Sequence, residues 1–572
     1  MAVARGGETL AVRDVDVLVV GSGGAAFVAA LTARHRGLEV LLVEKDAQLG
    51  GTTAFSGAVL WIPANPKIGG EAADSLADAR AYLQAQAGNY FNPERVDSFL
   101  AHGPEMVEFL ERETEVDFFA FPYPDYHPEQ PGASTMRSIG TYDYDYAKLG
   151  EHRELLRSGL TQTNFLGLAV GSNVEMKQLM SAGRSLAGLG FVASKMLTVL
   201  GQVLRYGRPQ PVTRGRALIA RLLRSAIDMG VDIWTSAPAR ELIMDGGRVA
   251  GAVVQTRHGP CRVMARRGVV LAAGGFPHDP ERQRRIFSHV AAGGEHHSVA
   301  PPGNTGDGAR MAEAVGGSVD YHVQQPAAFM PVSVIPYFDG TKALWPHIVD
   351  RQKPGFLCVT RDGRRFFDES APYHDFVPAM VKACAAQGQR DVCCYMIADL
   401  RAMRRYGMGF AKPAPVPWRH HVRSGYLIEG ATLADVARQA GIDGPALEAT
   451  VARFNQFAQA GEDPDFGRGQ NIYDHSQGDP DHKPNPNLAP LEQGPFFALR
   501  IVAGDIGTFA GLRTNGLAQV LGPDDAPIPG LYAAGNDALG VASGAYPGAG
   551  GTLGPGMTLG YIAALEMAGQ TG

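Results

Sequence analysis

A glycine-rich turn between two short apolar runs near the start of the chain is the strongest constraint on its fold. The run 16–20 is β-branched and apolar, as a buried parallel strand requires, and it leads into the turn Gly21-Ser22-Gly23-Gly24-Ala25-Ala26. An alanine-rich stretch of helical character follows to Arg34, and residues 38–43 form a second apolar run that ends at Glu44. This β-α-β pattern, with an acid about 20 residues beyond the turn, predicts a Rossmann-like dinucleotide-binding unit.

The residue types in the turn fit such a site. Gly21 permits the tight turn, Gly23 lets the backbone approach a pyrophosphate, and Ala26 allows close packing of the helix on the strand. Glu44 can bind ribose hydroxyls, and its charge disfavours a 2′-phosphate, so NADP is not expected. The predicted dinucleotide contacts in this segment are Gly21, Ser22, Gly23, Gly24, Ala25, Ala26, Glu44 and Lys45.

Composition excludes several classes of protein. The 572 residues are 45% hydrophobic and 19% charged, which indicates a globular chain with a large core, and the length fits about three or four domains. A formal net charge of −6 argues against nucleic acid as a partner. Five cysteines without regular spacing fit a reducing compartment and predict no metal site. No signal-peptide core and no apolar run of about 18 residues is present, so we expect a cytoplasmic protein.

The end of the chain carries a second glycine-rich region. Residues 530–536 read as a strand that ends in a glycine turn, and residues 546–554 form a loop with too many glycines for a packed element. Glycine lets the backbone approach a ligand and leaves N–H groups free to donate. Tyr546 stands beside these donors, where its hydroxyl can polarise a carbonyl oxygen. We therefore expect the two ends of the chain to meet at one cofactor.

The segment after the second predicted strand identifies the dinucleotide through a resemblance. Gly50-Gly51-Thr52-Thr53-Ala54-Phe55-Ser56-Gly57 is similar to the G-G-T/S-T-x-x-S-G segment of the flavoproteins that include soluble fumarate reductases and 3-ketosteroid dehydrogenases. The resemblance covers nearly the whole chain and implies FAD as the cofactor. Because residues 50–57 contain no histidine, we expect the FAD to be non-covalent. The further contacts that it implies are Gly50, Gly51, Thr52, Thr53, Ser56, Gly57, Ala273, Gly274, Gly535, Asn536, Gly551 and Leu553.

The same resemblance implies an α/β fold in which an α+β catalytic cap domain is inserted into a Rossmann-like FAD-binding domain. We place the FAD-binding domain at residues 10–156, 209–295 and 499–572, and the cap at 296–498. Within the FAD-binding part, the sequence predicts a helix from Ala217 to Met229, a strand at 231–234, a hairpin around Asp245-Gly246-Gly247 and a strand at 269–273.

Residues 157–208 form a separate insertion. The wider stretch 157–224 holds ten lysines and arginines against one acid, Glu175. Residues 186–200 within it are strongly apolar and compatible with a helix. Such a segment suits the face of an anionic membrane, which would place the protein peripherally on the inner face of the cell membrane. The alternative is a helical insertion that packs on the core or at a subunit interface.

Three tyrosines lie in turn-rich contexts that match a subgroup of this family. The 3-ketosteroid Δ1-dehydrogenases have P-x-x-D-Y, E-x-A-P-Y and terminal Y-P-G-x-G-x-x-x-G segments, which correspond here to Tyr126, Tyr373 and Tyr546. The resemblance implies that Tyr546 and the Gly550 N–H hold the C3 carbonyl oxygen of a steroid, and that Tyr373, assisted by Tyr126, removes the C2 proton. The flavin then takes the hydride from C1 and passes electrons to an external acceptor.

Three other functions remain open at this point. A fumarate reductase-like enzyme needs cations to clamp two carboxylates, and the predicted cap contains Arg361, Arg364 and Arg365. However, the segment that should present its acid–base arginine reads Asp368-Glu369-Ser370-Ala371-Pro372-Tyr373. A 3-ketosteroid Δ4-dehydrogenase would share the FAD, the tyrosines and the glycine loop. A flavin-binding electron carrier without enzymatic activity would not need the tyrosine in that loop.

Overall fold

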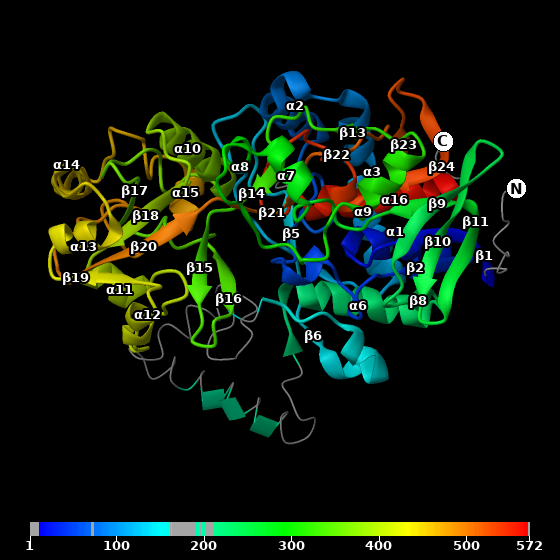
Figure 1. Cartoon of the computed structure of the whole chain (residues 1–572), viewed down its shortest axis with the longest axis horizontal. Coiled ribbons are helices and arrows are strands. Elements are labelled where there is room, and N and C mark those ends of the chain that lie inside the picture. The colour runs from blue at the N-terminus through cyan, green and yellow to red at the C-terminus, as the bar shows by residue number, and fades with distance from the viewer. Residues whose placement is uncertain are drawn as a thin grey trace, which may run out of the picture.

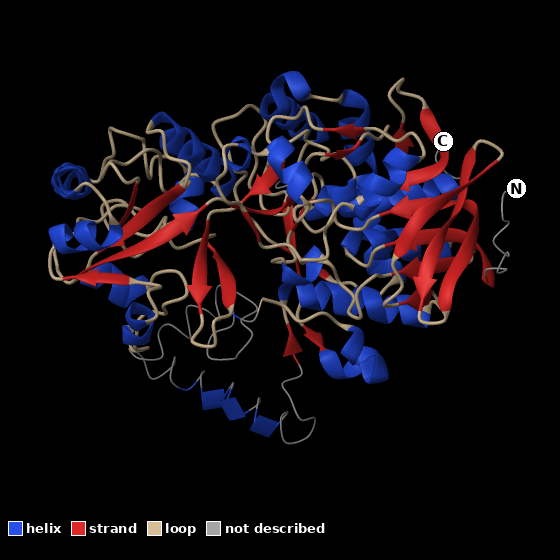
Figure 2. Cartoon of the chain, viewed as in Figure 1, coloured by secondary structure: helices blue, strands red, loops and turns tan. Residues whose placement is uncertain are grey.

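The protein consists of two lobes with a narrow connection (Figure 1). The computed structural model describes residues 11–69, 74–160 and 211–569, together with isolated positions between 162 and 201. Strands β1, β2 and β8–β11 lie in one lobe, and β15–β20 with helices α10–α15 lie in the other. Figure 2 shows helices alongside the strands in both lobes. The predicted α/β fold class is confirmed.

The first lobe is built on a mostly parallel sheet. Its strand order is β23-β24-β11-β1-β2-β8, in which β24, β11, β1, β2 and β8 run parallel. An antiparallel hairpin of β9 and β10 extends from β11, and β23 pairs antiparallel with β24. The strand bounds are β1 Ala11–Val20, β2 Val40–Val43, β8 Asp232–Trp234, β9 Ala239–Asp245, β10 Arg248–Thr256, β11 Gly259–Leu271, β23 Gln519–Leu521 and β24 Pro527–Ala533.

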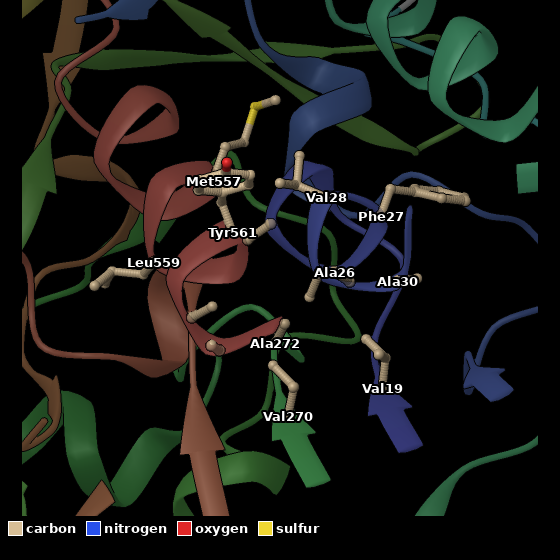
Figure 3. Close-up of a cluster of buried hydrophobic side chains, with 14 of the residues drawn as sticks. Val19, Ala26, Phe27, Val28, Ala30, Val270, Ala272, Met557, Leu559 and Tyr561 are labelled. Carbon is tan, nitrogen blue, oxygen red and sulfur yellow. The ribbon is translucent and has the colours of Figure 1, made fainter. Parts of the chain in front are cut away.

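A row of helices packs in the order α3, α16, α1 and α6. Helix α16 (Leu553–Met567) crosses α1 (Gly24–His35) so closely that a Cβ at Gly560 would lie 2.3 Å from the Ala25 carbonyl oxygen. Figure 3 shows Val28 and Met557 between these helices, with Val19 on its strand nearby. Helix α1 lies near the start of the chain and α16 lies near its end, so this packing brings the two ends together, as predicted. The outer helices are α3 Pro93–Glu113 and α6 Arg214–Asp228.

The local predictions for this lobe agree with the structure. The helix expected from Ala217 to Met229 is α6, and the strand expected at 231–234 is β8. The glycines Gly246 and Gly247 connect β9 to β10 with positive φ angles of 55° and 80°. Glycine adopts these angles without the steric penalty of other residues, which explains why this dipeptide marks the hairpin.

The second lobe contains an antiparallel sheet of order β16-β15-β20-β18-β17, with β19 paired to β20. Its strands are β15 Val332–Pro336, β16 Lys342–Pro346, β17 Phe356–Val359, β18 Cys393–Ala398, β19 Ile428–Gly430 and β20 Phe496–Val502. Its helices are α10 Tyr373–Ala386, α11 Leu400–Tyr406, α12 Arg419–Arg423, α13 Leu433–Ala440, α14 Gly444–Ala460 and α15 Ile472–Gln477. The expected domain boundary at 498/499 falls inside β20.

A small sheet of order β12-β21-β14 lies where the chain passes between the lobes. Strand β21 (Gly504–Thr508) follows β20 directly, and it pairs with β12 (His297–Ser298) and β14 (Ala327–Phe329).

The predicted domain limits remain predictions. The remaining described elements include β3 Leu60–Trp61, β4 Phe118–Ala120, β5 Ser138–Thr141, β6 Tyr144–Asp145, β7 Pro211–Val212, β13 Val319–Asp320, β22 Gly511–Leu512, α2 Leu76–Ala87, α7 Pro280–Ile286, α8 Ser288–Ala291 and α9 Asp307–Ala314.

Most of the predicted insertion at 157–208 lies outside the described residues. Of this segment, the structure describes 157–160 and isolated positions from 162 to 201. Gln162 donates from Nε2 to the Leu344 carbonyl oxygen of β16 at 2.8 Å. In the part of the chain that can be described, no helix has the length and hydropathy needed to cross a membrane.

Candidate functional site: a dinucleotide cavity beside a tyrosine cluster

A cavity that is open to solvent lies at the carboxyl ends of β1, β2 and β11, with a volume of about 1090 Å³ when the solvent at its mouth is included. It occupies the position where parallel sheets of this type bind ligands. The predicted cofactor residues that line it are Gly21, Ser22, Gly23, Gly24, Ala25, Glu44, Lys45, Gly51, Thr52, Thr53, Ser56, Ala273, Gly274, Gly535, Asn536 and Leu553. Four others, Ala26, Gly50, Gly57 and Gly551, are not part of its wall.

The turn after β1 has no room for a side chain at its first residue. Gly21 has a φ of 112°, and a Cβ there would lie 2.1 Å from the Ala272 carbonyl oxygen. Ser22 donates to Glu44 Oε2 at 2.6 Å, which fixes the acid at the end of β2 against the turn. Glu44 Oε1 accepts from the Asp46 N–H at 2.9 Å. The carboxylate is thus buried in the cavity wall and held in one orientation.

Two helix N-termini face the cavity. Helix α1 begins at Gly24, and α16 begins at Leu553, and both residues line the wall. The N-terminal N–H groups of a helix favour negative charge, as a pyrophosphate carries. Thr53 is already engaged there, because its Oγ1 accepts from the Gly24 N–H at 3.0 Å. The close backbone at Gly21 and these N-termini fit a bound dinucleotide.

Residues that the sequence reasoning did not assign to the cofactor also build this wall. Asn304 donates from Nδ2 to Thr52 Oγ1 at 2.9 Å and to the Gly274 carbonyl oxygen at 3.1 Å. Asp307 binds Lys45 Nζ at 2.5 Å. Both follow Gly303 in a turn-rich stretch that we had expected to belong to the cap domain. The glycines of that stretch were a signal of close approach to a ligand.

Asp537 supports the wall from behind. It follows the predicted contact Asn536, and its carboxylate accepts from the Ala273 N–H at 2.5 Å and from the Gly275 N–H at 3.0 Å. Burial raises the pKa of Asp537 to about 6. Its side chain therefore joins the turn after β11 to the turn after β24, two of the predicted cofactor segments.

The three predicted tyrosines converge from three distant parts of the chain. Tyr126 lies in a loop before β5, Tyr373 is the first residue of α10, and Tyr546 lies in the glycine loop before α16. Tyr126 donates its hydroxyl hydrogen bond to the Tyr373 hydroxyl at 3.0 Å. The ring centroid of Tyr546 lies 5.3 Å from Tyr126 and 5.5 Å from Tyr373. The structure therefore brings together all three side chains.

Burial dominates the acidity of this cluster. It raises the pKa of Tyr373 well above its usual value, and the neighbouring Tyr546 adds to this shift. The hydrogen bond from Tyr126 acts in the opposite direction and lowers the pKa of Tyr373, as expected for a group that stabilises the phenolate. Burial also raises the pKa values of Tyr126 and Tyr546. All three hydroxyls are thus protonated near neutral pH.

A fourth tyrosine completes the cluster. Tyr473, in α15, is buried, and its ring centroid lies 5.1 Å from that of Tyr126 in an edge-to-face arrangement. It was not predicted, because it has no motif and reaches the site only through the packing of α15. Phe509, which follows β21, contacts Tyr546 with ring centroids 5.7 Å apart. The surroundings of the three predicted tyrosines are therefore largely aromatic.

The glycine loop is held by its own backbone contacts. The Pro547 carbonyl oxygen accepts from the Tyr82 hydroxyl at 2.7 Å and from the Tyr126 N–H at 3.0 Å. Gly550 has a φ of 93°, and a Cβ there would lie 2.5 Å from the Val59 carbonyl oxygen. Among the residues described, none accepts a hydrogen bond from the Gly550 N–H. This donor is consequently available to a ligand.

Comparisons with known proteins agree with this geometry. The family model described as "FAD binding domain" matches residues 16–553. The chain is 40% identical to 4-oxocyclohex-2-ene-1-carboxylate 5-dehydrogenase of Sinomonas cyclohexanicum, over 97% of this chain and 93% of the relative. It is 36% identical to 3-oxosteroid 1-dehydrogenase of Mycolicibacterium smegmatis, over 97% of each.

A solved structure extends the likeness to three dimensions. The crystal structure of 3-ketosteroid delta1-dehydrogenase from Sterolibacterium denitrificans in complex with 1,4-androstadiene-3,17-dione has a TM-score of 0.90 and 34% identity. The match covers 98% of this chain and 100% of that one. The predicted FAD is confirmed as the cofactor, and the chain belongs to the FAD-binding flavoprotein oxidoreductases, in the family that contains the 3-oxosteroid 1-dehydrogenases.

Proposed function

We propose that this protein is an FAD-dependent 3-oxosteroid 1-dehydrogenase, which introduces a 1,2-double bond into a 3-ketosteroid. One observation carries the proposal: Tyr126, Tyr373 and Tyr546 converge beside a glycine loop whose Gly550 N–H is available. These are the side chains expected for removing a proton next to a ketone. The likeness to 3-oxosteroid 1-dehydrogenases over nearly the full chain supports the same reaction.

The roles follow from the chemistry of each group. Tyr546 and the Gly550 N–H would hold the C3 oxygen, which gains charge as C2 loses its proton, so these donors stabilise the transition state more than the ground state. Tyr373 would accept the C2 proton, and the hydrogen bond from Tyr126 would stabilise its phenolate. Bound FAD supplies the acceptor for the hydride from C1. It is held by the cavity residues named above, without a covalent bond.

Two of the three predicted cap arginines do not favour a dicarboxylate substrate. Arg365 forms ion pairs with Glu369 and Asp463, and Arg361 pairs with Asp391. These cations therefore balance carboxylates of the protein itself. A fumarate reductase would need them to bind the two carboxylates of its substrate. The aromatic cluster instead suits a neutral, apolar ketone.

A second candidate substrate is a small cyclic ketone that carries a carboxylate. It is favoured by the 40% identity to an enzyme named for 4-oxocyclohex-2-ene-1-carboxylate, which exceeds the 36% identity to the steroid enzyme of Mycolicibacterium smegmatis. The chemistry would be the same, since a proton next to the ketone and a neighbouring hydride are removed. The two substrates differ in size and charge away from the reacting carbons.

Product analysis distinguishes these candidates. The purified flavoprotein is mixed with androst-4-ene-3,17-dione, a saturated 3-ketosteroid or 4-oxocyclohex-2-ene-1-carboxylate, each with a dye as the electron acceptor. We expect dye reduction with the first compound and a 1,4-diene product. Turnover of the saturated steroid to a 4-ene would indicate a Δ4-dehydrogenase. Turnover of the carboxylate alone would assign the second candidate, and no turnover with any ketone would contradict both.

We also propose that an external electron acceptor reoxidises the reduced FAD.

We further propose that the protein is cytoplasmic and contacts the membrane surface. Phe338, at the turn between β15 and β16, is 81% exposed. Met196, Leu197 and Leu200, within the basic insertion, are exposed as well. Apolar side chains near basic residues favour an anionic lipid surface. Cosedimentation with anionic and neutral vesicles tests this, and equal partitioning of wild type and Phe338→Ser would contradict a role for that hairpin.

A further inference from the structure

A buried histidine follows one of the tyrosines that are proposed to act on the ketone and packs against another. His374 follows Tyr373 in the first turn of α10 and is 4% exposed. Its ring centroid lies 5.6 Å from that of Tyr546 and 5.7 Å from that of Phe509. This residue is thus adjacent to Tyr373 along the chain and packed against Tyr546 in space.

The ring of His374 contacts the backbone at two places. Nδ1 accepts from the Phe329 N–H, at the end of β14, at 3.3 Å. Because Nδ1 is an acceptor, the proton of the neutral ring is on Nε2. The ring also interacts with the backbone of Gly544. Burial lowers the pKa of His374 to about 3, so the ring stays uncharged at working pH. A neutral ring that contacts two backbone segments holds them together and contributes no charge to the site.

The Gly544 end of this bridge is a tight turn that precedes Tyr546. Ser543 and Gly544 both have left-handed backbone angles, with φ values of 50° and 97°. A Cβ at Gly544 would lie 2.5 Å from the backbone nitrogen of Gln325. The Gln324 N–H donates to the Ser543 carbonyl oxygen at 3.0 Å. The left-handed angle of Ser543 is costly for a residue other than glycine and is offset by the surrounding contacts, and the contact of His374 with Gly544 adjoins this residue.

We infer that His374 is a positioning residue, which sets the distance between the Tyr546 hydroxyl and the Tyr373 hydroxyl by tying the turn at 543–544 to the start of α10. The inference rests on the proposed function, in which Tyr546 holds the ketone oxygen and Tyr373 accepts the proton. Loss of the bridge would leave a buried N–H and a buried carbonyl without a partner and would let Tyr546 move relative to Tyr373. A displacement of about 1 Å in such a site can lower a rate by about 100-fold.

A double-mutant cycle tests this coupling in the FAD-loaded enzyme. His374→Phe removes the hydrogen bond to Phe329 and the polar contact with Gly544, and Tyr546→Phe removes the hydroxyl that they position. We expect His374→Phe to lower turnover by about 10-fold to 100-fold and to weaken binding of 1,4-androstadiene-3,17-dione, measured by calorimetry, while flavin content is unchanged. In the Tyr546→Phe background, the same substitution should lower turnover by less than about threefold, since the group that it positions is absent.

A matched control separates positioning from general destabilisation. His421, in α12 of the same lobe, is also buried, and it packs on Phe410 and Tyr426. His421→Phe should lower the Tm without changing turnover. His374→Gln, which keeps a donor and an acceptor, should recover part of the lost rate, and His374→Asn, which is too short, should not. If His374→Phe does not fold, His374→Gln and His374→Asn replace it in the double-mutant cycle with Tyr546→Phe.

Two results would overturn the inference. The first is an equal loss from His374→Phe in the wild-type and Tyr546→Phe backgrounds. The second is a Tm change with normal turnover and normal dienone affinity. Failure of the proposed function is a different result, because the wild type would then make no dienone and Tyr546→Phe would have no effect to compare.

Discussion

The dinucleotide cavity and the tyrosine cluster are built by opposite means. The cavity is made mainly of backbone at strand ends and helix N-termini, where the absence of a Cβ at Gly21 is essential. The cluster is made of side chains, and Tyr126 donates to Tyr373 across 247 positions of the chain. The comparison shows why one fold can keep its cofactor while its chemistry changes. Backbone geometry determines which cofactor is bound, and a few side chains determine which reaction the substrate undergoes.

The largest expected effect is on the cavity. Gly21→Ala would place a Cβ 2.1 Å from the Ala272 carbonyl oxygen, at a φ of 112°. We expect a protein without bound flavin, measured by absorbance after purification. Gly37→Ala is the matched control, because Gly37 also has a positive φ, of 84°, but no atom lies within 4 Å of the added Cβ. Normal flavin content in Gly21→Ala would contradict the claim that the cavity depends on the close packing of this turn against Ala272.

The next effect should be confined to the cluster. Tyr373→Phe removes the proposed base and should lower turnover by about 100-fold to 10,000-fold, with flavin content unchanged. Tyr426→Phe is a control, since this buried hydroxyl bonds Ser333 and the Phe410 N–H in the second lobe. The control should lose stability and keep its turnover. Near-normal turnover of Tyr373→Phe would remove this residue from the mechanism.

The acidity of the cluster predicts a pH dependence of the chemical step. Burial raises the pKa of Tyr373, so only a small fraction is deprotonated near neutral pH. The reactive form becomes more abundant as pH rises, and the rate of ketone-dependent flavin reduction should increase by about tenfold per pH unit, well below that pKa. Stopped-flow measurement between about pH 7 and pH 9 checks this. A rate that is flat or falls over this range would argue against a tyrosine base.

A smaller effect is expected from a change at Asp537, which supports the wall of the cavity. Asp537→Asn keeps one acceptor oxygen for two donors, the N–H groups of Ala273 and Gly275. One buried N–H is then unpaired, which costs about 1–3 kcal/mol and corresponds to a loss of up to about 100-fold in FAD affinity. Titration of the apo-protein with FAD measures it. Unchanged FAD affinity would show that these turns keep their geometry without the carboxylate.

The sequence predicted the cavity better than the cluster for a physical reason. The segment 21–44 forms a local β-α-β unit, so its spacing alone places Gly21 and Glu44 at one site. Asn304 and Asp537 were not assigned, because only the folded chain shows that they support the same turns. Gly50 was assigned to the cofactor but packs beside Ile219, with only 3.2 Å from an added Cβ to Ile219 Cγ2.

The cluster required a family resemblance. Nothing in the spacing of Tyr126, Tyr373 and Tyr546 shows that they meet, since each belongs to a different segment. Tyr473 has no motif and was missed. Its position depends on how the short helix α15 packs in the second lobe, which residue patterns near Tyr473 do not encode.

The central claim is that Tyr373 takes the proton from the carbon next to the ketone. Anaerobic single-turnover reduction of the flavin by a 3-ketosteroid deuterated at C2 tests it, with wild type and Tyr373→Phe compared. We expect deuterium at C2 to slow flavin reduction in the wild type, and the variant to bind the steroid but reduce its flavin far more slowly. Equal rates with both steroids, together with a normal rate in Tyr373→Phe, would contradict the claim.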